Sequence, residues 1–493
     1  MSEPSKKGIT PRAADYSQWY LDVIAGADLA EHAPVKGCMV IKPYGYALWE
    51  NIQRVLDEKI KETGHENAYF PLFIPKSFLN KEAEHVQFAK ECAVVTHYRL
   101  KSDPDLGIIP DPEARLEEEL IVRPTSETII YTMFAKWINS WRDLPLLLNQ
   151  WANIVRWEMR TRLFLRTTEF LWQEGHTAHA NESDAEEETR KMLNVYQDFA
   201  ENYLAISPIL GLKSESEKFP GALRTYSIEA MMQDGKALQS GTSHNLGQNF
   251  ARAFDVGFTD QNGARQYVWQ TSWGVSTRLI GGLIMSHSDD KGLVLPPKIA
   301  PVKAVIIPIW KSDEERTRVL DHAKELHRKL SDNFSKVAFD DRDYCTPGAK
   351  FNEWEKKGAP LRIELGPKDI ASDKVVIVER DTGLKISVGE HSAVNEVKAR
   401  LVSMQERLFQ KSKQFREEHS YRIDKYEDFS SRLESGRGFF YSHWCGNGAC
   451  EKRISDETKA TIRCMPFSEQ EEKGECIRCK EHSERRVVFA RAY

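Results

Sequence analysis

The chain has 493 residues, of which 41% are hydrophobic and 29% charged, a composition typical of a water-soluble protein with about three domains. Its formal net charge of -5 excludes a chain that is basic overall, so a nucleic-acid ligand would have to bind local basic patches. The polar N-terminus shows no apolar signal sequence, and no apolar run reaches the length of a membrane span. We therefore expect a cytoplasmic protein that does not bind a membrane.

The first predicted elements are a helix over residues 43–63 and a strand over residues 68–75. Apolar side chains recur at helical spacing through the first segment, and Gly64 follows it in the usual position after a helix. Two prolines restrict the strand to an edge or an end of its sheet. Many amphipathic helices followed by a strand share this pattern, so it carries little functional information by itself.

A second helix is predicted to begin near residue 125, in the sequence VRPTSETIIYTMF. Pro124 precedes it, and Thr125 or Ser126 can cap its N-terminus. A capping residue can also present its side chain to a ligand. Thr125 and Glu127 together offer the acceptors that the secondary ammonium group of a bound amino acid requires.

Residues 149–175 read as two strands joined by a basic loop that contains Arg166. Alternation along a strand places three side chains on one face of each strand: Ile154, Arg156 and Glu158 on the first, and Phe170, Trp172 and Glu174 on the second. If the strands pair, this surface suits a nucleotide, because arginine clamps phosphate and an aromatic ring stacks on a base. An amphipathic strand with its polar side in water is the alternative, but it explains the mixture of aromatic and charged residues poorly.

Further along, residues 184–205 read as an exposed helix to which we assign no chemistry, and two strands should follow it. In the second of them, Gly241 and Gly247 indicate close backbone approach or bulges. Gln239, Thr242 and His244 bring short polar groups together there. A single histidine is more often a structural residue than a functional one, so this segment is ambiguous by itself.

The segment YVWQTSWGVSTRLIGGLIMSH predicts a strand followed by a helix that begins at Arg278. Gly281 and Gly282 would allow that helix to pack tightly. A phosphate gains at a helix start from the free N–H groups and from the helix dipole. An ordinary strand–helix junction with an exposed arginine is the alternative.

A linker over residues 286–301 precedes a second unit with α/β alternation. It should contain a buried strand near residue 305, a helix that Ser312 and Glu315 begin as a capping box, a strand near Val337, a helix capped by Thr346, and two more strands. A long charged helix from about residue 394 to residue 418 then leads to the last part of the chain.

Five of the 8 cysteines lie in the last fifty residues. Two close pairs, Cys445 with Cys450 and Cys476 with Cys479, indicate a tetrahedral zinc site in a reducing compartment. Four thiolates would close the coordination shell, so the site would be structural. Unligated buried cysteines are the alternative, and Cys464 would be a spare thiol in either case.

The arrangement Arg156-Trp157-Glu158, followed by Arg166, Phe170 and Glu174, resembles motif 2 of class II aminoacyl-tRNA synthetases. The words RPTSE, VRWE, FLRT, LWQEGHTAHA and QSGTSH are similar to prolyl-tRNA synthetases in particular, in their shorter archaeal/eukaryotic-like form. The predicted helix and strand over residues 43–75 resemble motif 1, and the segment around Arg278 resembles motif 3.

This resemblance implies an α/β multidomain fold in three parts. Residues 1–295 would form a catalytic domain with an antiparallel sheet, residues 301–405 an α/β anticodon-binding domain, and residues 406–493 a small α+β domain that binds zinc. Motif 1 builds the dimer interface in the family, so a homodimer is implied as well.

The resemblance also assigns roles residue by residue, with Arg156 and Arg278 as the catalytic residues. The residues that would bind ATP are Arg156, Glu158, Arg166, Thr167, Phe170, Gln239, Thr242, Ser276 and Arg278. The residues that would bind proline are Phe88, Thr125, Glu127, Arg156, Trp172, Glu174, His244, Ser272 and Gly274. The residues that would read the anticodon are Glu355, Arg362 and Lys368.

The implied reaction joins L-proline to tRNA(Pro) through a prolyl-adenylate, with ATP as its Mg²⁺ complex. The interval from about residue 176 to residue 270 leaves no room for an editing domain, so some activation of alanine or cysteine is expected. A synthetase for threonine or glycine is the nearest alternative. The other is a synthetase-like protein that binds tRNA without catalysis, and retention of Arg156, Glu158 and Arg278 argues against it.

Overall fold

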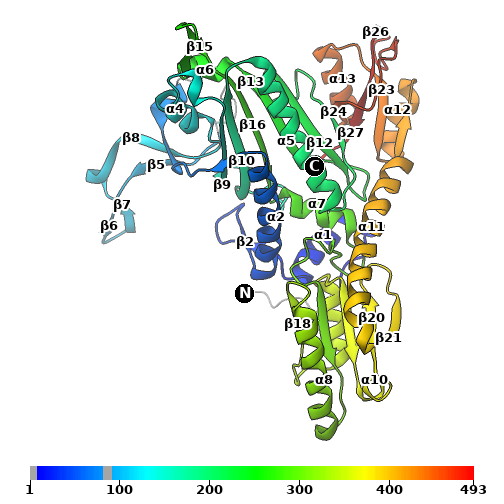
Figure 1. Ribbon diagram of the computed structural model, residues 1–493. Coiled ribbons are helices and arrows are strands. Elements are labelled where there is room, and N and C mark those ends of the chain that lie inside the picture. The colour runs from blue at the N-terminus through cyan, green and yellow to red at the C-terminus, as the bar shows by residue number, and fades with distance from the viewer. Residues whose placement is uncertain (1–7, 81–90) are drawn as a thin grey trace.

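The computed structural model describes residues 8–80 and 91–493 and is built around one eleven-stranded sheet (Figure 1). In spatial order its strands are β22 (Ser420–Arg422), β23 (Phe439–His443), β27 (Arg486–Ala490), β24 (Thr461–Pro466), β11 (Ile209–Leu212), β12 (Arg224–Met231), β13 (Ala237–Gly247), β16 (Trp269–Ser276), β10 (Glu169–His179), β9 (Leu146–Val155) and β3 (Glu66–Asn67). The consecutive pairs from β11 to β9 are all antiparallel. The predicted antiparallel catalytic sheet is therefore confirmed.

The two strands predicted within residues 149–175 are β9 and β10, and they pair with Phe170 opposite Ile154 and Glu174 opposite Gln150. β9 ends at Val155, three residues before Glu158, which the strand pattern placed on this strand. Arg156 still donates its backbone N–H to the carbonyl of Thr168, at 2.8 Å, and the chain then leaves the ladder. Glu158 therefore lies in the loop between the strands rather than on a strand.

Helices cover the sheet because each has one apolar face, and α5 crosses β12, β13 and β16 (Figure 1). The main helices of this part are α1 (Tyr16–Gly26), α2 (Pro43–Glu62), α4 (Glu127–Trp137), α5 (Glu182–Asn202) and α7 (Arg278–His287). The apolar faces of α1, α2, α5 and α7 meet in one core with the large buried side chains Trp19, Tyr196 and Trp273, whereas α4 packs in a second core with Phe250 and Phe254. The helices predicted around residues 43–63 and 184–205 are confirmed within three residues at each end.

α7 lies very close to the loop that joins β9 and β10. A Cβ atom at Gly281 would lie 2.4 Å from Cδ2 of Leu165 in that loop, so only glycine allows this approach. The predicted tight packing at Gly281 is confirmed. It brings Arg278, at the start of α7, next to the basic loop.

The predicted strand over residues 68–75 is mostly wrong. Within it only the short β4 (Phe73–Pro75) is extended in a ladder, because the backbone N–H of Phe70 donates to the side chain of Gln150 instead, at 2.6 Å. β4 belongs to a small sheet on an arm that projects from the body (Figure 1). The strands and the helix of this arm are β4, α3 (Lys76–Asn80), β5 (Val94–His97), β6 (Leu100–Asp103), β7 (Gly107–Pro110) and β8 (Arg115–Val122). The remaining short elements are β1 (Ala30–His32), β2 (Met39–Ile41), α6 (Asn249–Ala253), β14 (Gly257–Thr259) and β15 (Arg265–Tyr267).

The second unit is a five-stranded sheet with helices, in the order β18-β17-β19-β20-β21. Its elements are β17 (Ala304–Pro308), α8 (Asp313–Ser331), β18 (Val337–Phe339), α9 (Pro347–Lys356), β19 (Leu361–Leu365), α10 (Pro367–Ala371), β20 (Lys374–Glu379) and β21 (Lys385–Gly389). β17 is parallel to β18 and β19, but β20 and β21 are antiparallel, and β21 was not predicted. The capping box is incomplete, since Glu315 accepts from the N–H of Lys311 and not from that of Ser312.

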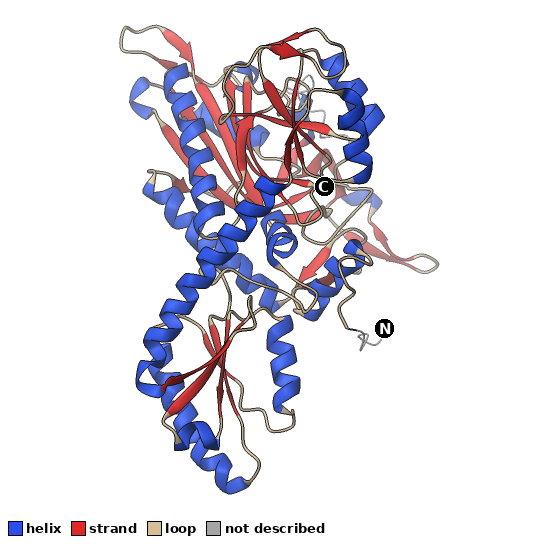
Figure 2. Ribbon diagram, turned by 90° about the vertical axis from the view of Figure 1, so that its right-hand side faces the viewer, coloured by secondary structure: helices blue, strands red, loops and turns tan. Residues whose placement is uncertain are grey.

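Helix α11 (Ala393–Glu418) leads from the second unit back to the body of the molecule (Figure 2). The last part of the chain then adds the strands β22, β23, β24 and β27 to the core sheet. Its other elements are α12 (Tyr426–Ser435), α13 (Gly448–Thr458), β25 (Gly474–Glu475) and β26 (His482–Ser483). The junction is the pairing of β24 with β11, where Gly211 lies opposite Pro466.

Buried charges reinforce that junction. Glu229 on β12 is fully buried and lies between Lys213, at 2.8 Å, and Arg463 of β24, at 3.0 Å.

None of the helices in the described residues is both long enough and apolar enough to cross a membrane.

Candidate active site

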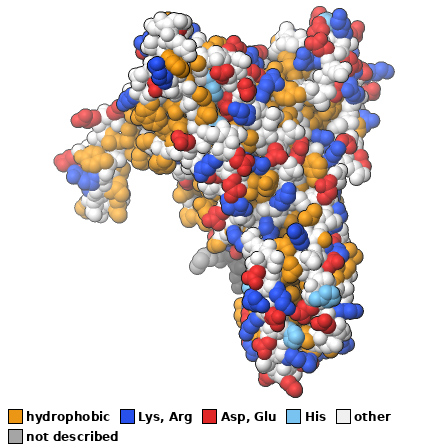
Figure 3. All heavy atoms as spheres, viewed as in Figure 1, with side chains coloured by type: hydrophobic (Ala, Val, Ile, Leu, Met, Phe, Trp, Pro, Cys, Tyr) orange, Lys and Arg blue, Asp and Glu red, His pale blue; other side chains and the backbone are white. Residues whose placement is uncertain are grey.

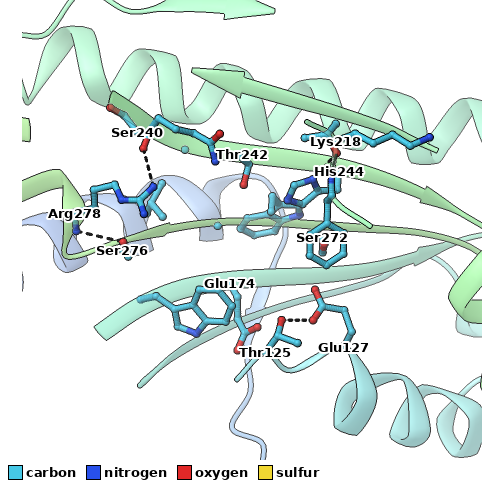
Figure 4. A pocket seen from close by; sticks show the side chains of 18 of the residues that line it. Thr125, Glu127, Glu174, Lys218, Ser240, Thr242, His244, Ser272, Ser276 and Arg278 are labelled. Carbon is cyan, nitrogen blue, oxygen red and sulfur yellow. Dashed lines mark hydrogen bonds between the residues drawn. The ribbon is translucent and has the colours of Figure 1, made fainter. Parts of the chain in front are cut away.

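A cavity of about 300 Å³ lies over the middle of the core sheet, where β10, β13 and β16 run next to one another (Figure 4). The start of α4 and the loop between β11 and β12 close its sides. Most predicted site residues line this cavity, namely Thr125, Glu127, Arg156, Phe170, Trp172, Glu174, Gln239, Thr242, His244, Ser272, Gly274, Ser276 and Arg278. Segments far apart in the sequence thus meet at one site, as the motifs predict.

One end of the cavity carries carboxylates. Glu127 is the first residue of α4, where the helix dipole favours a negative charge, and it accepts a hydrogen bond from the hydroxyl of Thr125 (Figure 4). Ser126 occupies the N-cap position, but its side chain makes no capping hydrogen bond and donates to Glu174 instead. The capping role predicted for Thr125 or Ser126 is therefore wrong, because both hydroxyls serve the carboxylates of the cavity.

Glu174 is buried and held by several partners. Its Oε1 also accepts from Nε2 of Gln150 at 2.7 Å, and its Oε2 lies 3.0 Å from Nε2 of His176. Burial alone would raise the pKa of Glu174, but these hydrogen bonds and the charge of His176 lower it below the ordinary value. Glu174 is thus a fixed negative charge at this end of the cavity.

The other end of the cavity carries cations. Arg156 donates from Nε to the carbonyl of Pro124 at 2.9 Å, and its guanidinium carbon lies 5.7 Å from the ring centroids of both Phe170 and Trp172. Burial, together with the nearby charges of Arg156 and Arg166, lowers the pKa of Arg278 to about 10. Cations that repel one another in a cavity make a binding site for a polyanion, which would neutralise them.

The buried polar atoms of lining residues that lack a hydrogen-bond partner among the described residues include Nε1 of Trp172 and Oγ of Ser272. Such groups are costly unless a ligand or water pairs with them.

Burial and the nearby charge of His176 lower the pKa of His244 to about 3, so His244 is neutral at physiological pH. Its Nδ1 lies 3.0 Å from the hydroxyl of Thr225.

Three of the residues predicted to bind ATP do not line the cavity. Glu158 and Arg166 pair with each other at 2.7 Å in the loop between β9 and β10. Thr167 is buried and donates its hydroxyl to the carbonyl of Glu169 at 2.7 Å, while Phe88 lies outside the described residues. The roles assigned to these four residues remain predictions.

Sequence reasoning missed other residues of this site. His176 could have been found, because it lies two residues after Glu174 and so shares its face of β10. Gln150 shares the face of Ile154 by the same alternation, and Ser126 stands between Thr125 and Glu127, whereas Phe219 had no such signal because tertiary contacts alone bring it to the cavity.

Comparison with known proteins identifies the family. The model described as "tRNA synthetase class II core domain (G, H, P, S and T)" matches residues 111–287, "Anticodon binding domain" matches residues 303–400, and "Prolyl-tRNA synthetase, C-terminal" matches residues 426–493. The chain is 58% identical over 489 residues to the proline–tRNA ligase of Porphyromonas gingivalis (strain ATCC BAA-308 / W83), covering 99% of both chains. The chain belongs to the proline–tRNA ligase family. It is also 55% identical over 490 residues to the enzyme of Christiangramia forsetii, covering 99% of this chain and 100% of the other.

These matches confirm the predicted class II fold. They also confirm the predicted resemblance to prolyl-tRNA synthetases, in preference to a synthetase for threonine or glycine. The C-terminal match also agrees with the archaeal/eukaryotic-like form. Between β10 and β16 the structure holds α5, the core-sheet strands β11, β12 and β13, the short α6 and the pair β14 and β15. All residues of this interval are described, and they form no separate domain.

Two of the three predicted anticodon residues of this proline–tRNA ligase line one small cavity, of about 170 Å³. Glu355 pairs there with Lys291 at 3.4 Å. Arg362 is held by Glu364, at 3.0 Å, and its guanidinium carbon lies 4.2 Å from the ring centroid of Phe351. Lys368 lies on α10 and does not line this cavity.

The four predicted zinc ligands come together. The sulfur atoms of Cys445, Cys450, Cys476 and Cys479 all lie within 4.8 Å of one another, with 3.6 Å between Cys450 and Cys476 and 3.5 Å between Cys445 and Cys479. A tetrahedral zinc ion with bonds of about 2.3 Å would require sulfur atoms about 3.8 Å apart, so the four thiols fit that ion. Cys464 is buried away from this group, in β24.

The buried pair of His176 and Glu174 predicts a pH dependence. Burial would lower the pKa of His176, but the hydrogen bond and charge of Glu174 outweigh it and raise the pKa above the ordinary 6.5. The charged imidazolium therefore stabilises the fold fully below about pH 6.5, and this contribution is lost as the pH rises through the raised pKa.

We expect the thermal midpoint of the wild-type chain to fall more between about pH 6 and pH 9 than that of His176→Gln. Scanning calorimetry at several pH values would measure the difference. His482→Gln is the control, because this histidine is exposed. Equal slopes for His176→Gln and wild type would contradict a charged His176.

Proposed function

We propose that this chain joins L-proline to tRNA(Pro) in two steps, through a prolyl-adenylate formed in the cavity described above. The observation that carries the proposal is the polarity of the cavity, with carboxylates at one end and guanidinium groups at the other. The secondary ammonium of proline would bind near Glu127 and Thr125. The triphosphate of ATP would bind near Arg278, and the reacting groups would meet at Arg156.

In the first step the proline carboxylate attacks the α-phosphate of ATP and pyrophosphate leaves. A carboxylate is already a nucleophile, so the protein supplies positioning and charge rather than a base. Arg156 would hold the α-phosphate and the carboxylate, and Arg166 and Arg278 the other phosphates, with Mg²⁺ entering as part of the ATP complex. Glu158 would accept from the adenine amino group, and Phe170 would stack on the ring.

Other residues would shape the two substrate sites. Gln239, Thr242, Ser276 and Thr167 would contact ATP. The unpartnered Nε1 of Trp172 and Oγ of Ser272 would face the proline, beside His244 and Gly274, while Glu174 would act as a fixed charge. Phe88 would complete the apolar wall.

In the second step the terminal ribose hydroxyl of the tRNA attacks the carbonyl of the adenylate and AMP leaves. Glu355, Arg362 and Lys368 would read the anticodon, since arginine can make paired hydrogen bonds with guanine. We divide the chain accordingly into a catalytic part (1–295), an anticodon-binding part (301–405) and a C-terminal part (406–493) with a structural zinc ion at the four cysteines. The reaction would take place in the cytoplasm, where charged tRNA is used.

We also propose a homodimer. Seven large apolar side chains are exposed on or beside the projecting arm: Tyr69, Phe73, Val94, Tyr98, Leu100, Leu106 and Ile108. Figure 3 shows hydrophobic atoms gathered on this arm and on the adjoining body. An exposed apolar patch of this kind marks an interaction surface, and a second copy of the chain would cover it. Sedimentation equilibrium tests this, because a monomer at micromolar concentration would contradict it.

The first experiment is ATP–pyrophosphate exchange with each of the twenty amino acids and no tRNA. We expect strong exchange with proline and weaker exchange with alanine and cysteine, because a pocket discriminates one methylene by only about 10- to 200-fold. With no editing domain in the chain, Ala-tRNA(Pro) should persist when the purified enzyme is added. Exchange with a different amino acid but not with proline would contradict the assignment of proline as the substrate. Rapid deacylation of Ala-tRNA(Pro) would contradict the proposal that the chain has no editing activity.

A further inference from the structure

The loop between β11 and β12, residues 213–223, contributes Phe219 to one wall of the cavity, and Lys218 of this loop lies beside His244 (Figure 4). The rings of Phe219 and His244 have centroids 4.8 Å apart. The backbone N–H of Phe219 donates to the hydroxyl of Thr225 at 2.9 Å, and the same hydroxyl contacts His244. The position of this loop therefore sets the shape of the pocket around His244.

The C-terminal part of the chain holds the start of this loop. The hydroxyl of Ser214 donates to Oε1 of Glu451 at 2.7 Å, and the hydroxyl of Ser216 donates to Oε2 of the same carboxylate. Glu451 is 5% exposed and lies in the first turn of α13, directly after Cys450 of the four-cysteine group. One buried carboxylate thus binds two side chains of the loop from outside the catalytic part.

Between these anchored serines and the cavity wall the chain makes a tight turn. The carbonyl of Ser214 accepts from the N–H groups of Glu217, at 3.1 Å, and Lys218, at 2.9 Å. Phe219 follows directly. A displacement of Ser214 would therefore be transmitted to the residues that line the pocket.

Attachment of the C-terminal part does not require these two hydrogen bonds. β24 already pairs with β11, and Lys213 and Arg463 already meet on the buried Glu229. Removing Glu451 would leave these contacts in place. The contacts from Glu451 to Ser214 and Ser216 instead fix the loop that follows Lys213.

We propose that Glu451 is a positioning residue for the amino-acid pocket, and that through Ser214 and Ser216 it holds Phe219 against His244. The C-terminal part thereby contributes to recognition of the amino acid although it does not touch that substrate. The inference rests on the proposed assignment of this cavity to proline. It concerns the proline end, so binding of ATP at the arginine end should not depend on Glu451.

The test is steady-state ATP–pyrophosphate exchange by the full chain with Glu451→Ala. We expect KM for proline to rise about tenfold, because the buried hydroxyl of Ser214 and the more exposed hydroxyl of Ser216 both lose their acceptor, while KM for ATP changes less than about twofold. Glu451→Gln keeps an oxygen for one serine and should restore most of the affinity. Amide hydrogen exchange should also become faster at Glu217, Lys218 and Phe219 in Glu451→Ala.

The matched control is Glu457→Ala. Glu457 lies on the same helix and pairs with Arg478 of the cysteine-rich loop, at 2.9 Å, but it does not contact residues 213–223. The double variant Ser214→Ala with Ser216→Ala approaches the same contact from the loop, and adding Glu451→Ala to it should cause no further rise in KM for proline. This double variant also tests the proposal if Glu451→Ala fails to fold.

Three results would overturn the inference. They are an unchanged KM for proline in Glu451→Ala, an equal rise of this KM in Glu457→Ala, and additive effects of Glu451→Ala and the double serine variant. These outcomes differ from failure of the proposed function. If the cavity were not the proline pocket, Glu127→Ala, which alters the cavity itself, would keep a wild-type KM for proline. If Glu127→Ala loses proline binding and Glu451→Ala does not, the pocket assignment stands and the positioning role falls.

Discussion

Replacing Arg156 by alanine should slow proline-dependent ATP–pyrophosphate exchange by about 10²- to 10³-fold or more, the usual cost of losing one preorganised charge donor. Arg156 is held by the carbonyl of Pro124 and by two aromatic faces, so its guanidinium is already placed before substrates bind. It lies at the arginine end of the cavity, near enough for the charges of Glu127 and Glu174 to act on it, and there the proline carboxylate and the α-phosphate would meet. Both carry negative charge that must be neutralised as they approach.

The effect should appear mainly in kcat, because the charge acts most strongly on the transition state. Arg156→Lys keeps a positive charge but loses the planar group, so its activity should fall between those of wild type and Arg156→Ala. Arg160→Ala is the matched control, since this exposed arginine lies four residues further along the same loop and does not line the cavity. Wild-type turnover by Arg156→Ala would contradict the proposed mechanism.

The site residues that could be predicted from the sequence are those that lie in a regular local pattern. Glu174 and Trp172 follow from alternation along one strand, and Arg278 from a strand that turns directly into a helix. These local rules hold because β10 and β16 pair without a bulge from Trp172 to His179. The same rules extended β9 too far, to Glu158, whereas the chain leaves the ladder after Arg156 to form the loop.

Features that depend on long-range contacts could not be predicted. Nothing near residue 70 reveals that the side chain of Gln150 would replace a strand partner for Phe70. Likewise, no local pattern joins β24 to β11, since the two strands are some 250 residues apart in the sequence. The predicted C-terminal part was therefore expected as a separate unit, whereas its strands continue the core sheet.

The zinc prediction has a readout that is independent of catalysis. Purified wild-type chain should contain a single zinc ion at the four-cysteine group, and Cys476→Ser should contain little or none. Binding of a structural zinc ion contributes roughly 10–16 kcal/mol to the folding of a small metal domain, so its loss should unfold the C-terminal part. The thermal midpoint should fall, and new protease-sensitive sites should appear after about residue 420.

The consequences should extend into the catalytic part because of the shared sheet. Without an ordered β24, the buried Glu229 would lose Arg463 and keep only Lys213, which leaves part of its charge uncompensated. Cys464→Ala is the control: this buried thiol lies in β24 outside the cysteine group, so the variant should keep its zinc and lose only packing. Metal analysis, calorimetry and limited proteolysis would measure these effects. A Cys476→Ser chain with full zinc content and a wild-type midpoint would show that these four cysteines do not hold a structural metal ion.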